Sequence, residues 1–279
     1  MISFKDYLNS FKFNNRNWYC LVVDVIFAII LTIVFVVSGQ ILNSSANKIS
    51  LGMDANGIKE YLLTAPINQV QAYSTNLQVF VITIIVLTIL LLVITLFLYS
   101  LSRALIWNKL NNKKLTKKTY WRWNALNLAL LIPLFLYWVV SIIILTLVSG
   151  IITLLTRPLA NFAMLHPTFM QNSIGIVMTL ITSFLILLFL VFTLLTYNNF
   201  AKTHLVGKSM LHSYQKIIQN KKYALKIILF AIITSLVLGL ITFGISKLPL
   251  ISSVQMIIGV LLSLLYLAWL RIYLIKTIA

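Results

Sequence analysis

The sequence predicts an all-α membrane protein, a polytopic bundle of about six transmembrane helices with amphipathic segments on the cytoplasmic face. Hydrophobic residues make up 61% of the chain and charged residues only 9%, whereas a soluble domain carries about 25% charge. A transmembrane helix needs about 20 apolar residues, and a barrel strand would be half as long and alternate in polarity. Six continuous apolar stretches meet the helical requirement, at roughly 20–42, 77–101, 125–148, 174–197, 223–245 and 250–273.

The positive charges predict the orientation of these spans. With the N-terminus inside, the inner segments carry 3, 7, 6 and 2 Lys or Arg, and the outer segments carry only Lys48, Lys59, Arg157 and Lys247. Cytoplasmic loops retain basic residues. We therefore expect a multi-pass protein of the cell membrane with both termini in the cytoplasm.

The first span is preceded by a short basic segment, residues 1–17. Phe4, Leu8 and Phe11 recur at helical spacing, which is typical of an interfacial amphipathic helix. Cys20, at the start of the span, is expected to face lipid, with palmitoylation as the alternative. In the outer loop at 43–76, we expect Asp54 to cap a short helix that Pro66 ends.

The second connection, 102–124, is the most basic. Trp107, Tyr120, Trp121 and Trp123 are interleaved with its seven cations. This mixture is typical of a belt of aromatic residues at the membrane border with cations extending to the headgroups.

The third apolar block, 125–155, is longer than one span. Pro133 should kink it, and Ser149-Gly150 is the expected end of the crossing. Residues 151–165 would then lie along the outer surface as an interfacial helix, with a re-entrant loop as the alternative. In the next basic connection, 198–222, an apolar stripe that includes Leu211 and Tyr214 predicts a helix on the inner face.

The chain also carries a weak internal repeat. Trp18, Trp123 and Tyr223 each open an odd-numbered span about 100 residues apart. Three helical hairpins in the same orientation would explain this spacing. The alternative is that every membrane hairpin places aromatic residues and cations at its borders.

Two polar residues within the spans are candidates for a functional site, Asp24 and Asn127. A carboxylate inside the membrane is costly and is a functional candidate by default. Asp24 lies roughly one and a half turns from the inner border, so an ion pair with Arg103, Arg122 or Lys226 is favoured over a proton or ion site. Asn127 could line a cavity mouth, although helix packing is the simpler interpretation.

The net charge of +18 is expected to serve contact with anionic lipid headgroups on the cytoplasmic side, at about 1 kcal/mol per basic residue. No nucleic-acid-binding motif surrounds the basic residues. The residues expected at the headgroups are Lys113, Lys114, Lys117, Lys118, Lys221 and Lys222.

Scarcity of reactive residues argues against catalysis. The chain has four acidic residues and three histidines, with no paired carboxylates, no metal-ligand spacing and no nucleophile motif. We expect no catalytic residues, no metal and no cofactor. The favoured function is a non-enzymatic scaffold, assembly factor or accessory subunit with a membrane-protein partner. The alternatives are a transporter or channel for a small solute or ion and, less favoured, a lipid-modifying enzyme.

Overall fold

The computed structural model describes residues 7, 10–11, 15–50, 52–156, 167–249 and 251–277. Every regular element in these ranges is helical, which confirms the predicted fold class. Within them, six helices are long and apolar enough to cross a membrane. The first five predicted spans lie within helices that extend beyond them at both ends, and the sixth, 250–273, falls on a helix that runs Ser252–Thr277.

The chain divides into two compact units. The smaller comprises Asp24–Ser102, and the larger comprises Met1–Val23 together with Arg103–Ala279. Two long helices, α2 (Asn15–Ser50) and α4 (Ile67–Leu110), contribute to both units.

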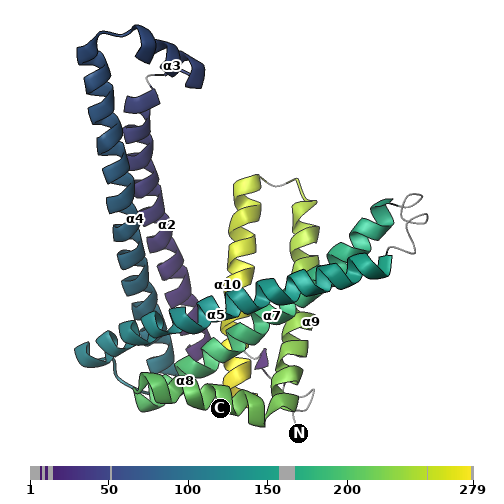
Figure 1. The fold of residues 1–279 in the computed structure, drawn as a ribbon. Helices are drawn as coiled ribbons and strands as arrows, with labels where there is room; N and C mark the ends of the chain where they lie inside the picture. The colour runs from purple at the N-terminus through teal and green to yellow at the C-terminus, as the bar shows by residue number, and fades with distance from the viewer. Residues whose placement is uncertain are drawn as a thin grey trace. The chain divides into compact units, whose positions relative to one another are not determined.

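In the smaller unit, α2 and α4 run antiparallel, with α3 (Ala55–Thr64) at the end where they are connected (Figure 1). The ring centroids of Phe27 and Tyr99 lie 5.9 Å apart between the two long helices. The Asp54 carboxylate accepts a hydrogen bond from the Gly57 amide at 2.8 Å, so the predicted N-cap of α3 is confirmed.

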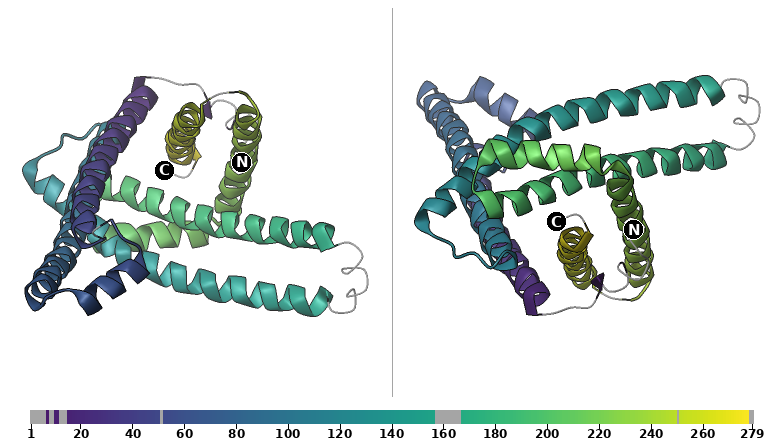
Figure 2. Two further views of the ribbon diagram at one scale, coloured as in Figure 1. Left: turned by 90° about the horizontal axis from the view of Figure 1, so that it is seen from above. Right: turned by 90° about the horizontal axis from the view of Figure 1, so that it is seen from below.

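In the larger unit, α5 (Lys117–Thr156) and α7 (Pro167–Thr203) form an antiparallel hairpin and lie side by side in both views of Figure 2. Tyr137 stacks on Phe189 between them, with ring centroids 4.7 Å apart. Ser149-Gly150 does not end the helix, because α5 continues to Thr156, and the end of the crossing at these residues stays a prediction. A helix satisfies its own backbone in an apolar environment, so one glycine does not end it. Residues 157–166 lie outside the described residues, and they include most of the segment 151–165 that was expected along the outer surface.

The rest of the larger unit consists of α8 (Val206–Gln219), α9 (Lys221–Ser246) and α10 (Ser252–Thr277). The helix predicted within 198–222 is confirmed as α8. Its apolar residues Leu211, Tyr214 and Ile218 are exposed, whereas Ser209 and Ser213 are buried. The small polar edge of α8 therefore packs on the protein and leaves the apolar stripe outward.

The described N-terminal residues pack against α9 and α10. Tyr7 stacks on Phe230 with ring centroids 4.6 Å apart, and its hydroxyl shares a 2.9 Å hydrogen bond with the Thr234 hydroxyl. The indole of Trp269 donates to the Ser10 hydroxyl at 2.8 Å. Phe4 and Leu8 of the predicted interfacial helix lie outside the described residues.

Cys20 is fully buried, so the expected lipid-facing position is wrong. Burial of the thiol within the protein also argues against palmitoylation at this residue. A cysteine behaves as a small apolar group, and protein atoms cover it as readily as lipid does.

Candidate functional site at the end of the second hairpin

The two polar candidates inside the spans are both buried and belong to different units. Asp24 on α2 is 2% exposed in the smaller unit, and Asn127 on α5 is 5% exposed in the larger. Of the cations expected to pair with Asp24, Arg103 is buried, whereas Arg122 and Lys226 are exposed, and all three belong to the larger unit. The ion pair of Asp24 stays a prediction.

The six lysines expected at anionic headgroups are all exposed. Four lie in and after the connection between α4 and α5, and two open α9. Contact with lipid stays a prediction for each of them: Lys113, Lys114, Lys117, Lys118, Lys221 and Lys222.

A buried polar and aromatic cluster gathers where α4 and α7 end and α5 begins. We call it the end cluster, and it consists of Trp107, Asn108, Trp123, Asn124, Asn127, Tyr197 and Asn198. The three helices bring these residues together because each presents the last or first turns of an apolar span, where amide groups become tolerable. None of the seven side chains is titratable near neutral pH.

Hydrogen bonds tie the end cluster across helices. The Tyr197 hydroxyl on α7 donates to Oδ1 of Asn127 on α5 at 2.8 Å. Asn111 donates through Nδ2 to Oδ1 of Asn198 at 3.2 Å and to the Trp107 carbonyl at 3.0 Å. These contacts join α5 to α7 and the end of α4 to α7.

The end of α7 is also tied to α8. Asn199 donates through Nδ2 to the Ser213 hydroxyl at 2.8 Å, and the hydroxyls of Thr203 and Ser209 lie 2.9 Å apart. The small serine side chains let α8 approach closely, which explains why the polar edge of this helix is the buried one. The amphipathic helix is thereby fixed to the hairpin beside the end cluster.

Two tryptophans flank Tyr197 in the end cluster. The ring centroids of Trp107 and Trp123 lie 6.3 and 5.7 Å from that of Tyr197, and both indoles are fully buried. The predicted aromatic belt is therefore wrong for these two, whereas Trp121 is 53% exposed. Residues two apart on a helix point about 200° apart, so Trp121 and Trp123 cannot both face lipid.

His204 marks the edge of this region. It follows α7 with φ 56°, in the left-handed region, and its amide donates to the Phe200 carbonyl at 2.7 Å. Burial lowers the pKa of the His204 imidazole, and the positive charges of Arg122 and Lys113 lower it further. His204 is therefore neutral at pH 7, and the surroundings of the end cluster are electropositive.

Hydroxyl groups within the spans bond their own helices. Ten of them donate to the carbonyl four residues earlier at 2.7–3.0 Å, and these are Thr32, Ser38, Thr83, Thr153, Thr179, Thr182, Thr193, Thr234, Thr242 and Ser263. Ser235 donates to the carbonyl of Ile232, three residues earlier, whereas the Ser141 hydroxyl is buried without a partner. A hydroxyl satisfied in this way needs no partner from another helix or a solute.

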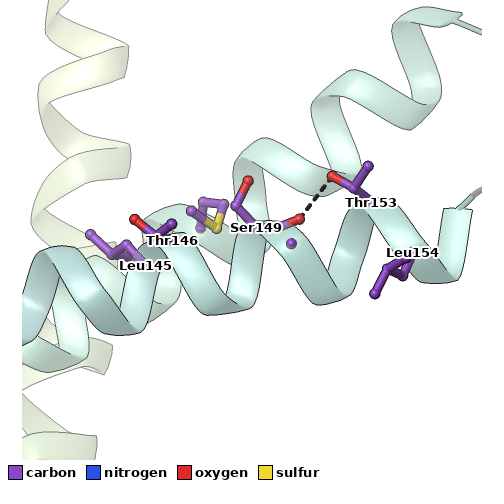
Figure 3. Close-up of a pocket in the computed structure, with 7 residues that line it drawn as sticks. Leu145, Thr146, Ser149, Thr153 and Leu154 are labelled. Atoms are coloured by element: carbon purple, nitrogen blue, oxygen red, sulfur yellow. Dashed lines mark hydrogen bonds between the residues drawn. The ribbon is translucent and has the colours of Figure 1, made fainter.

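An open groove follows α5 and α7 toward their connection. Leu145, Thr146, Ser149, Gly150, Thr153 and Leu154 of α5 line it together with Met178 of α7. Figure 3 shows Thr146, Ser149 and Thr153 in succession along α5, with the Thr153 hydroxyl bonded to the Ser149 carbonyl at 2.9 Å. A Cβ added to Gly150 would meet no atom within 4 Å, so the space beside it is open.

Metal ligands do not gather in the described part of the chain, where no group of three His, Cys, Asp or Glu could hold an ion. Comparison with known proteins matches no family model, no curated protein and no solved structure.

Sequence reasoning singled out Asn127 but missed most of its neighbours. Asn108 and Asn198 were not recognised as site residues, because isolated amides near helix ends are common. A signal was present in Tyr197-Asn198-Asn199, three polar residues directly after an apolar run. Asn108 stands at the corresponding point near the end of α4, so clustered amides at span ends are the feature to look for.

Proposed function

We propose that this chain is a non-enzymatic, multi-pass protein of the cell membrane that acts as a scaffold, assembly factor or accessory subunit. Both termini are in the cytoplasm in this proposal. Its partner is an apolar transmembrane helix of another membrane protein. The observation that carries the proposal is the open groove along α5 beside Gly150.

The chemistry of the groove supports a helix as its occupant. Thr146, Ser149, Gly150 and Thr153 are small and stand at positions i, i+3, i+4 and i+7, so they share one face of α5. Small residues let two helix backbones approach closely, and close packing drives helix association in lipid. The self-bonded hydroxyls of the spans favour packing over a polar path for a solute.

A substitution that fills the groove tests the proposal. Because a Cβ at Gly150 would meet no atom within 4 Å, Gly150→Phe should leave the protein folded. The ring should fill the groove and abolish cross-linking of a partner helix to a photoreactive residue at Thr146. Gly239→Phe on α9 is the matched control, because the space beside Gly239 is equally open. Cross-links from Thr146 to lipid alone, or to the chain's own α2 or α4, would contradict the proposal.

Contact with the cytoplasmic leaflet is the second part of the proposal. The exposed Leu211, Tyr214 and Ile218 of α8 suit burial at the level of the headgroups, and Lys221 and Lys222 follow in the next helix. Anionic lipid would attract these lysines, and salt would weaken the attraction. We expect the full protein in anionic nanodiscs to retain more anionic lipid around it than the double variant Lys221→Gln/Lys222→Gln does.

Transport of a small solute or ion is the second candidate, favoured by one observation, the burial of Asp24 within a span. In that case Asp24→Asn would abolish ion-dependent uptake into proteoliposomes without lowering thermal stability. Under the scaffold proposal, the same substitution lowers thermal stability, and there is no uptake to lose.

A further inference from the structure

Several buried polar atoms of the end cluster lack a hydrogen-bond partner within the protein. They are Nε1 of Trp107, Oδ1 and Nδ2 of Asn108, Nε1 of Trp123, Oδ1 of Asn124 and Nδ2 of Asn198. Their residues are at most 5% exposed. Folded proteins pair the large majority of such atoms with protein groups, ordered water or a ligand. Five residues with such atoms on three neighbouring helices are a concentration that packing alone does not explain.

The five residues occupy one region of the larger unit. The ring centroids of Trp107 and Trp123 lie 6.3 and 5.7 Å from that of Tyr197. Asn198 follows Tyr197 directly and is bonded through Asn111 to the carbonyl of Trp107. Asn108 and Asn124 each adjoin one of the two tryptophans in the sequence.

The inventory of these atoms identifies the chemistry of a ligand. Two indole N–H groups and two amide NH₂ groups can donate, and two amide oxygens can accept. An ionised phosphate only accepts hydrogen bonds, so it would leave both amide oxygens unpaired. An ammonium group only donates, so it would leave the four donors unpaired. A hydroxyl group does both, and it adds no charge to a cluster whose residues carry none.

We propose that the end cluster binds uncharged hydroxyl groups. Two sources can supply them, namely ordered water and the polyol headgroup of a lipid. The position beside α8, whose apolar stripe is exposed, favours access from the headgroup level. This inference concerns the end cluster and not the groove on α5, so it does not depend on the proposed function.

The test compares variants of the full protein in an amine-oxide detergent, whose headgroup has no hydroxyl. If hydroxyl groups occupy the cluster, Asn108→Leu and Asn124→Leu should each lower the unfolding temperature by about 2–4 °C or more. The control Asn47→Leu, at an exposed helical position on α2, should leave it unchanged. Leucine replaces an amide with an apolar group of similar shape, which costs nothing at Asn108 if its two side-chain atoms are unpaired. Asn124→Leu also removes the 3.2 Å hydrogen bond from Nδ2 of Asn124 to the Tyr120 carbonyl, so Asn108→Leu is the diagnostic variant and Asn124→Leu can only contradict the proposal.

The source of the hydroxyl is identified by a probe, mono-octanoylglycerol, with methyl octanoate as the control that lacks hydroxyls. A lipid polyol is the source if the probe raises the unfolding temperature of the wild type but not of Asn108→Leu. Ordered water is the source if neither compound has an effect while both Asn→Leu variants are destabilised. The proposal is overturned if the unfolding temperature of Asn124→Leu, or of both variants, is unchanged or raised. Asn124→Leu gives this result on its own if Asn108→Leu fails to fold.

Discussion

Tyr197→Phe removes a single hydroxyl from the end cluster and keeps its packing. The ring contacts of Tyr197 with Trp107 and Trp123 persist in phenylalanine, while the 2.8 Å bond to Asn127 is lost. Tyr197 and Asn127 are 3% and 5% exposed, so water does not readily replace the lost donor. The substitution therefore reports on one buried hydrogen bond between α5 and α7.

The expected loss follows from this geometry. Side-chain hydrogen bonds between membrane helices contribute about 0.6 kcal/mol on average and up to about 1.7 kcal/mol. A short, buried bond belongs in the upper half of that range, so we expect a loss of about 1 kcal/mol. In a chain of this size, that loss corresponds to a fall of about 2–4 °C in the unfolding temperature.

The assay is reversible unfolding in detergent micelles for wild type, Tyr197→Phe, Asn127→Leu and the double variant. The double-mutant cycle should give a coupling of about 1 kcal/mol, because both single changes remove the same bond. Tyr214→Phe is the matched control, since Tyr214 on α8 is 57% exposed and should tolerate the change. A coupling below about 0.3 kcal/mol, the usual limit of additivity, would refute the pairing of α5 with α7 through these residues.

Three further changes test other parts of the fold. Tyr7→Phe breaks the hydrogen bond to Thr234 and should speed proteolysis of the N-terminal segment in detergent, whereas equal rates would mean that ring stacking alone holds it. Asp54→Ala removes the cap of α3 and should cost about 1 kcal/mol locally, seen as faster amide exchange at Gly57 with α4 unchanged. Because the pKa of His204 is lowered below its ordinary value of about 6.5, folding should lose stability as pH falls below 6.5, when the unfolded chain binds the proton first. His204→Asn, which tolerates the left-handed backbone, should remove that loss, and an unchanged pH profile would contradict the assignment.

The sequence was sufficient for the features that depend on local pattern. Long apolar runs predicted the helices, an apolar stripe predicted α8, and Asp54 predicted the cap of α3. Each of these follows from residues within a few turns of one another. The capping carboxylate, for example, needs only an amide three residues away.

The features that depend on tertiary packing were not predictable in the same way. Nothing in the sequence of 102–124 distinguishes buried Trp123 from exposed Trp121. Their burial differs because only the side of α5 that carries Trp123 packs against α7. Cys20 is likewise buried between two partly exposed neighbours in the sequence. The composition of such a segment predicts that it lies at the border of the membrane. It does not predict which of its residues contact protein.

The predicted three-hairpin repeat stays a prediction, and two contacts support it. Ser10 accepts a hydrogen bond from Trp269 near the end of α10, and Ser213 accepts one from Asn199 near the end of α7. Both serines precede an odd-numbered span and engage the second helix of a hairpin. Leu8-Asn9-Ser10-Phe11 and Leu211-His212-Ser213-Tyr214 are similar at these positions.

The orientation of the spans is the claim on which both the cytoplasmic lipid contacts and the cytoplasmic termini depend. It is tested most directly by labelling single cysteines in intact cells, in a background where Cys20 is replaced by alanine. We expect cysteines at Ser45 and Lys247 to react with an impermeant maleimide from outside, and a cysteine at exposed Lys114 to react only after permeabilisation. Labelling of position 114 in intact cells would contradict the account.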